Sequence, residues 1–251
     1  MKVAAIQHDI VWEDASATHA HVTPLIAEAA GAGAQLIVLT EMFATGFSMH
    51  PEKIAEDEGG LSEQFLRNNA REHRVHLIAS VAQRGPDGAY RNNAIVASPD
   101  GSVQRYAKIH PFSYAGEDEK YAAGRDFLTV EIEDVRTTVF VCYDLRFADE
   151  FWVRALETDL YVVVANWPAP RVAHWSALLT ARAIENQAYV LGVNRVGEAD
   201  GSRYVGASAL IDPMGHQMTE PIEDECTLFG DVEPEQVVAI RAKFPFLADR
   251  R

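Results

Sequence analysis

A short apolar run that ends in a cysteine constrains the fold of this chain more than any other stretch. Residues 137–141, TTVFV, are β-branched or aromatic, which is typical of a buried strand. The run stops at Cys142, and residues 145–157 then carry charged and apolar residues at helical spacing. The pattern predicts that Cys142 lies in a sharp turn between a strand and a helix. In such a turn a side chain is exposed above the sheet, where backbone N–H groups can bind an oxyanion.

Further apolar runs indicate an α/β fold. Ala34–Thr40 and Leu160–Ala165 are continuous apolar segments, of the kind that is buried on both faces of a sheet. Helical patterns separate such runs in both halves of the chain, and Pro-Asp-Gly turns bracket Ala89–Ser98, which predicts an antiparallel meander. Because we find no repeat, linker or low-complexity tract, we expect one domain over residues 1–251, with helices covering mixed sheets.

Two helix starts are predicted from local residue types. Thr23 is a candidate N-cap for a helix that begins at Pro24, unless Pro24 kinks a helix that begins earlier. Ser62 is a candidate N-cap for a helix over Leu61–Arg74.

The composition excludes several classes of protein. Hydrophobic residues make up 48% and charged residues 24% of the chain, so disorder is not expected. The net charge of −15 argues against nucleic acid or an anionic membrane surface as the main partner. No run approaches the roughly 18 apolar residues of a membrane span, and the first residues lack the features of a signal peptide. With only two cysteines, Cys142 and Cys226, we expect a cytoplasmic protein with free thiols.

Three predicted strand ends carry the groups that acyl transfer through a thioester needs. Glu41 could take a proton, Lys108 could stabilise an oxyanion and Cys142 could attack a carbonyl carbon. Each has an ordinary alternative, as a loop cap, a solvated strand end and a small core residue respectively. Three such coincidences are rarer together than singly, so the set favours a catalytic role.

The segments around these residues resemble the three signature blocks of the nitrilase superfamily of carbon–nitrogen hydrolases. The blocks are LTEMF (Leu39–Phe43), YAKIHPF (Tyr106–Phe112) and VCYDLRF (Val141–Phe147). The resemblance spans nearly the whole chain and implies a four-layer α-β-β-α sandwich. It also implies Glu41, Lys108 and Cys142 as catalytic residues, in a reaction that requires no metal or other cofactor.

The family pattern implies a second glutamate in the loop after the lysine block, seven residues before a glycine. Glu117 has that spacing from Gly124, since 124 − 117 = 7. Asp118 and Glu119 are its acidic neighbours, and the alternative interpretation is an acidic solvated loop.

Three more segments are similar to bacterial ω-amidases, a branch that hydrolyses the terminal amide of 2-oxoglutaramate and 2-oxosuccinamate. They are EMFATGFSM, ANWPAPR and HWSALLTARAIENQAYVLGVNRVG. Other branches share the Glu-Lys-Cys triad, so its presence does not identify the substrate. The alternatives are an N-carbamoyl or deaminated-glutathione hydrolase, or a non-catalytic interaction protein on the same fold.

Four residues that follow the catalytic strand ends are candidates for binding a small amide substrate in one pocket. They are Phe43, Tyr143, Arg146 and Trp167. Arg146 could form a bidentate pair with a substrate carboxylate. Its alternative role is a structural ion pair with Asp144, Asp149 or Glu150.

The family usually forms homo-oligomers, so the resemblance implies a homodimer or a higher oligomer. The helix after Cys142 and the C-terminal tail are candidate contacts. Phe244, Phe246 and Leu247 are apolar residues in a charged tail, which is consistent with burial against another surface. The chain has 9 histidines, but none has a cysteine or histidine partner at zinc spacing, so no metal site is predicted.

Overall fold

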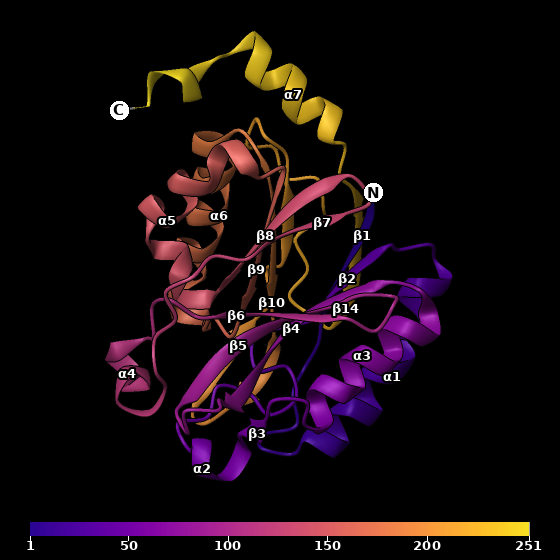
Figure 1. Cartoon of the computed structure of the whole chain (residues 1–251), viewed down its shortest axis with the longest axis vertical. Coiled ribbons are helices and arrows are strands. Elements are labelled where there is room, and N and C mark those ends of the chain that lie inside the picture. The colour runs from indigo at the N-terminus through magenta and orange to yellow at the C-terminus, as the bar shows by residue number, and fades with distance from the viewer. Residues whose placement is uncertain (251) are drawn as a thin grey trace.

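A mixed sheet of seven strands forms one half of the structure, a computed structural model that describes residues 1–250 (Figure 1). The strand order is β14-β1-β2-β4-β5-β6, with β3 paired to β4 beside that path. The bounds are β1 Lys2–Gln7, β2 Leu36–Val38, β3 Glu56–Asp57, β4 His76–Arg84, β5 Tyr90–Ala97, β6 Val103–Ala107 and β14 Cys226–Asp231. Strands β1, β2 and β4 are parallel, and β4, β5 and β6 form the antiparallel meander that the turn residues predicted.

A second sheet of five strands has the order β13-β10-β9-β8-β7. The bounds are β7 Thr129–Ile132, β8 Val135–Val141, β9 Leu160–Ala165, β10 Tyr189–Asn194 and β13 Ala209–Ile211. Strands β8, β9 and β10 are parallel, so their carboxyl ends lie at one edge. A separate hairpin is formed by β11 (Val196–Ala199) and β12 (Ser202–Val205).

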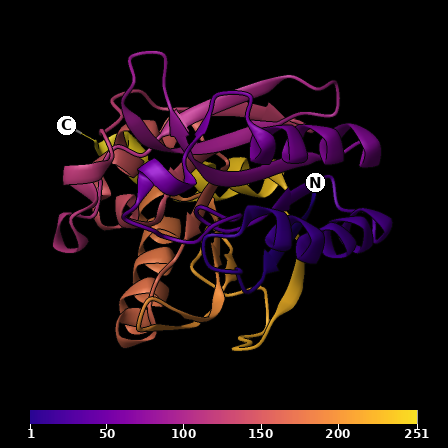
Figure 2. The same cartoon turned by 90° about the horizontal axis from the view of Figure 1, so that it is seen from below.

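Helices cover the outer face of each sheet. Their bounds are α1 Ala15–Gly31, α2 Pro51–Ile54, α3 Leu61–His73, α4 Glu117–Lys120, α5 Ala148–Arg154, α6 Val172–Asn186 and α7 Pro234–Lys243. Figure 2 shows α1 and α3, in indigo and purple, on one side and α6, in orange, on the other. Within residues 1–250, we find no helix with the length and apolar composition needed to cross a membrane.

Side chains of the first sheet alternate between two cores. Val3 and Ala5 pack in the cluster that joins the two sheets, whereas Ala4 and Ile6 pack in a second cluster with α1 and α3. Since successive residues of a strand point to opposite faces, a strand covered on both faces has to be apolar throughout. The layers therefore follow the order α-β-β-α, which confirms the expected sandwich.

Thr23 and Ser62 are not N-caps, although α3 begins at Leu61 as predicted and Pro24 lies inside a helix that begins earlier, which was the alternative prediction. Helix α1 begins at Ala15 because the Asp14 carboxylate accepts a hydrogen bond from the Ala17 N–H at 3.0 Å, and Pro24 lies inside the helix. Helix α3 has Gly60 as its N-cap. The N–H and hydroxyl of Ser62 instead donate to the Glu56 carboxylate, at 2.7 and 2.6 Å.

The helix predicted over residues 145–157 is broken into shorter pieces. A 3₁₀ turn over Cys142–Arg146 precedes α5, and a second 3₁₀ turn over Ala155–Glu157 follows it. The first break occurs because the Asp144 side chain binds backbone N–H groups outside the helix.

Candidate active site

Glu41, Lys108 and Cys142 meet where strands of the two sheets end. Glu41 lies three residues beyond β2, Lys108 directly follows β6 and Cys142 directly follows β8. The Nζ atom of Lys108 is 2.9 Å from Oε1 of Glu41, and both side chains are fully buried. The charges of Glu41 and Lys108 both act on the Cys142 thiol. Tertiary folding thus assembles a carboxylate, an ammonium and a thiol in one place.

Glu117 lies on the other side of the lysine ammonium. Its Oε2 atom is 2.8 Å from Nζ of Lys108, and its side chain is buried, whereas Asp118 and Glu119 are exposed. The N–H of Gly124 donates to the main-chain oxygen of Lys108 at 2.8 Å. A side chain at Gly124 would overlap the main-chain oxygen of Ala107, which explains a glycine at this spacing.

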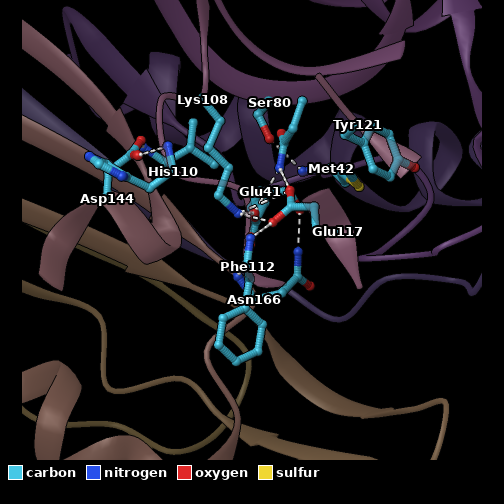
Figure 3. A network of polar contacts seen from close by, with 12 residues as sticks. Glu41, Met42, Ser80, Lys108, His110, Phe112, Glu117, Tyr121, Asp144 and Asn166 are labelled. Carbon is cyan, nitrogen blue, oxygen red and sulfur yellow. Dashed lines mark hydrogen bonds and ion pairs between the residues drawn. The ribbon is translucent and has the colours of Figure 1, made fainter. Parts of the chain in front are cut away.

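Two asparagines, Asn92 and Asn166, fix the carboxylates in this network. Figure 3 labels Glu41, Lys108, Glu117 and Asn166. The Nδ2 group of Asn92 donates to Oε1 of Glu41 at 2.8 Å and to Oε1 of Glu117 at 3.2 Å. The N–H of Asn166 donates to Oε2 of Glu41 at 2.8 Å. Among residues 1–250, one N–H group donates to Oε2 of Glu41, whereas two donors reach each oxygen of Glu117. Lys108 and Asn92 donate to Oε1 of Glu117, and Lys108 and the N–H of Phe112 donate to its Oε2.

The shared burial of these groups shifts their pKa values. Burial alone would lower the pKa of Lys108, but the charges of Glu117 and Glu41 raise it above its ordinary value. Burial raises the pKa of Glu117, against the attraction of Lys108. Burial and the charge of Glu41 raise the pKa of the Cys142 thiol well above its ordinary value, although Lys108 opposes this. The thiol is therefore neutral at rest and needs a base before it can attack.

Asp144 holds the turn that carries the thiol. The backbone of Cys142 has a left-handed φ of 47°, which residues other than glycine seldom adopt. The buried carboxylate of Asp144 accepts from the N–H of Val141 at 3.0 Å, the N–H of His110 at 2.8 Å and the hydroxyl of Tyr106 at 2.8 Å. Burial raises the pKa of Asp144 to about 6. This carboxylate ties the cysteine turn to the segment that carries Lys108.

A pocket of about 800 Å³ opens over Cys142. Three of the residues predicted for substrate binding line it, namely Tyr143, Arg146 and Trp167. Its other walls are largely aromatic and basic, and include Trp12, Phe47, Phe112, Tyr114, Arg171, Arg203 and Tyr204. The site is therefore a concave, mainly apolar pocket with a few polar groups and a thiol, as is usual for small-molecule sites.

Comparison with known proteins decides the family. The family model for carbon-nitrogen hydrolases matches residues 2–242 of this chain. The chain belongs to the carbon–nitrogen hydrolase family. Members of this family hydrolyse carbon–nitrogen bonds, so this carbon–nitrogen hydrolase is an enzyme that acts on amide C–N bonds.

Relatives of this carbon–nitrogen hydrolase cover nearly its whole length. It is 39% identical to the omega-amidase YafV of Yersinia enterocolitica, over 99% of this chain and 96% of that protein. It is 31% identical to a 2-oxoglutaramate amidase of Bacillus subtilis, over 87% of this chain and 85% of that protein. Its structure matches XC1258 of Xanthomonas campestris, a CN-hydrolase superfamily protein with an arsenic adduct in its active site, with a TM-score of 0.94 and 34% identity. That match covers 100% of this chain and 97% of the other, which confirms the fold.

Phe43 does not line the pocket of this hydrolase, so the prediction that it binds substrate is corrected. Its ring is fully buried in the core under α1 and α3, at 5.9 Å from the ring of Phe65 and 5.6 Å from that of His19. Met42 has a left-handed φ of 39°, and the N–H of Phe43 donates to Ser80 O at 3.0 Å. This turn directs the Phe43 side chain away from Cys142.

Arg146 does line the pocket, and among residues 1–250 it forms no ion pair with Asp144, Asp149 or Glu150. Its guanidinium lies 4.8 Å from the ring of Trp167, and its Nη2 contacts Nδ1 of His174 at 3.2 Å. The charge is therefore available to an anion in the pocket.

Asn92 and Asn166 are site residues that no sequence pattern singled out. Asn166 directly follows β9, as Cys142 directly follows β8, so a polar residue at a third strand end was the signal that could have identified it. Asn92 lies inside β5 and gave no such signal.

Proposed function

We propose that this hydrolase is an ω-amidase, which cleaves the terminal amide of 2-oxoglutaramate and 2-oxosuccinamate to the dicarboxylate and ammonia. The main support is the 39% identity to an omega-amidase over 99% of the chain. The pocket adds to it, because Arg146 places an unpaired positive charge in the same cavity as the thiol. A 2-oxoacid amide carries one carboxylate for such a charge and one amide for the thiol.

We infer that the acylation step uses Glu41 as the base. Glu41 accepts the thiol proton, Sγ of Cys142 bonds to the amide carbon, and the carbonyl π electrons move to the oxygen. The Lys108 ammonium and the N–H of Tyr143 stabilise the resulting oxyanion. The C–N bond then breaks with its electron pair on nitrogen, which takes the proton from Glu41 and leaves as ammonia.

Glu41 also acts as the base for hydrolysis of the thioester. Oε2 of Glu41 accepts a single protein hydrogen bond and retains a lone pair for water, whereas both oxygens of Glu117 are already occupied. Water adds to the thioester carbon as it gives a proton to Glu41, and the thiolate leaves and recovers that proton. Glu117 has the role of orienting Lys108 and Asn92, with two hydrogen bonds to the ammonium.

Ammonia release from a panel of amides tests this function. The panel is 2-oxoglutaramate, 2-oxosuccinamate, glutamine, asparagine, an N-carbamoyl amino acid and deaminated glutathione. We expect the wild type to release ammonia from the two oxoacid amides alone and Cys142→Ala to release none. Preferred hydrolysis of another member of the panel would replace the substrate assignment, and full activity of Cys142→Ala would exclude the thioester mechanism.

We also propose that the enzyme is a homodimer that works in a reducing compartment such as the cytoplasm. Cys142 and Cys226 are both free, and the reaction requires a reduced thiol. Val153 on α5 and Ile184 on α6 are exposed apolar residues, and such residues support self-association.

A further inference from the structure

Asn166 occupies a distinctive place in the wall of the pocket. Strand β9 pairs in parallel with β8, which ends at Cys142, and with β10, so Asn166 follows the strand that lies next to the nucleophile. Asn166 lines the pocket together with Cys142, although only 4% of its surface is exposed. Asn166 therefore belongs to the wall of the cavity that opens over the thiol.

The hydrogen bonds of Asn166 fix which atom of its amide remains free. Its Nδ2 group is 2.6 Å from the main-chain oxygen of Glu41, which can only accept a hydrogen bond. The nitrogen must therefore face that carbonyl, and Oδ1 must face elsewhere. Oδ1 is buried and has no hydrogen-bond partner among residues 1–250. A buried acceptor without a partner destabilises the protein. A donor from outside the chain is therefore expected to form a hydrogen bond with Oδ1.

Neighbouring contacts hold Asn166 rigidly. Its own N–H donates to Oε2 of Glu41 at 2.8 Å. The next residue, Trp167, is held by Asn194, whose Oδ1 accepts from the Trp167 N–H at 2.7 Å and whose Nδ2 donates to the Trp167 oxygen at 3.0 Å. The free Oδ1 is thus preorganised before a substrate arrives, as specific recognition requires.

The groups around Cys142 separate into donors and acceptors. Lys108 and the N–H of Tyr143 are donors, suited to the oxygen of a bound amide. Oε2 of Glu41 and Oδ1 of Asn166 are acceptors. The two atoms are linked through Asn166, whose N–H donates to Oε2 of Glu41. A primary amide has two N–H bonds, and one acceptor is available for each. An ester oxygen or a nitrile nitrogen has none to offer.

We propose that Oδ1 of Asn166 accepts an N–H of the substrate amide, and of ammonia as it leaves, and so selects nitrogen over oxygen leaving groups. This inference rests on the proposed amidase function and adds a residue that recognises the leaving group. Asn92 offers a matched comparison. It also donates to Glu41 and also has a free buried Oδ1, but it does not line the pocket.

The test uses competition between water and ammonia for one acyl-enzyme. The 5-methyl ester of 2-oxoglutarate acylates Cys142 and releases methanol, after which water gives 2-oxoglutarate and added ammonia gives 2-oxoglutaramate. In the second reaction ammonia bonds to the thioester carbon, the C–S bond breaks, and a proton passes from nitrogen through Glu41 to the thiolate. The initial ratio of amide to acid reports recognition of ammonia and is independent of the acylation rate.

We expect Asn166→Ala to lower this ratio by about fivefold, as the loss of one hydrogen bond to a neutral donor implies. Asn92→Ala should lower both rates through Glu41 and leave the ratio unchanged. If Asn166→Ala had the same ratio of amide to acid as the wild type, the proposal would be overturned. A residue that only positions Glu41 would change the reactions of water and ammonia with the thioester alike. So would an equal fall in both variants.

A second measurement needs no variant. Dimethylamine is a stronger nucleophile than ammonia but has a single N–H, which Glu41 takes, so the wild type should capture it less efficiently than ammonia. Equal or better capture of dimethylamine would count against the role of Asn166. Failure of the wild type to process the ester and the amide at all would instead overturn the proposed function, and this inference with it.

Discussion

At the scale of single residues, Arg146 provides a test of substrate recognition. Its guanidinium lies over Trp167 in the pocket and has no acidic partner among residues 1–250. Because a hydrogen bond to a charged group contributes about 1.5–3 kcal/mol, we predict that Arg146→Gln raises KM for 2-oxoglutaramate by about tenfold or more, with a smaller effect on kcat. Steady-state kinetics would measure both constants.

Glutaramide, which has no carboxylate, is the control substrate for this variant. Its KM should be nearly the same for Arg146→Gln and the wild type. A similar rise for both substrates would mean that Arg146 supports the pocket wall rather than binding an anion.

At the scale of elements, the segment from Lys108 to Gly124 depends on close packing at its end. A Cβ atom at Gly124 would overlap the main-chain oxygen of Ala107, at the end of β6. We predict that Gly124→Ala destabilises the protein by about 1–3 kcal/mol, as overpacking usually does, and lowers kcat because it displaces the segment that carries Glu117. Thermal unfolding and kcat would be measured together.

Gly31→Ala is the matched control for this change. Gly31 is the last residue of α1, and a Cβ atom there would meet nothing within 4 Å. Alanine also favours a helix over glycine by up to about 1 kcal/mol, so stability should be unchanged or higher. If both variants behave alike, the close approach at Gly124 does not anchor the segment.

At the scale of the whole molecule, the outer face near α5 and α6 is the candidate dimer surface. Val153 on α5, Leu156 in the 3₁₀ turn after α5 and Ile184 on α6 are 53%, 57% and 51% exposed, and α5 and α6 lie side by side in Figure 1. Phe246 in the tail is 61% exposed, whereas Leu247 packs against the body. Such apolar residues are expected to be covered by a second copy.

Light scattering at micromolar concentration would test this surface. We predict a dimer for the wild type and a shift toward monomer for Val153→Glu, because a charge buried in an apolar interface is unfavourable. Leu61→Glu, at a 69% exposed position on α3 in the other outer layer, should remain dimeric. A monomeric wild type would exclude the proposed dimer.

Much of the fold is determined by the sequence itself. Strand β9 has the bounds that its apolar run predicted, Leu160–Ala165, because a strand covered on both faces must be apolar throughout. The apolar patterns predicted strand ends at Glu41, Lys108 and Cys142, and the packing of the two sheets brings these ends together. The family assignment also followed from the short signature blocks.

Tertiary structure decided the direction and the partners of individual side chains. Phe43 lies next to Met42 in the sequence, yet a left-handed turn sends its ring into the core under α1 and α3. Asn92 and Asn166 reach Glu41 across 51 and 125 residues of chain. Local patterns report which face of an element is apolar, because that depends on residues a few positions apart. They cannot report which polar groups meet across two sheets, since those contacts exist only after the layers have packed.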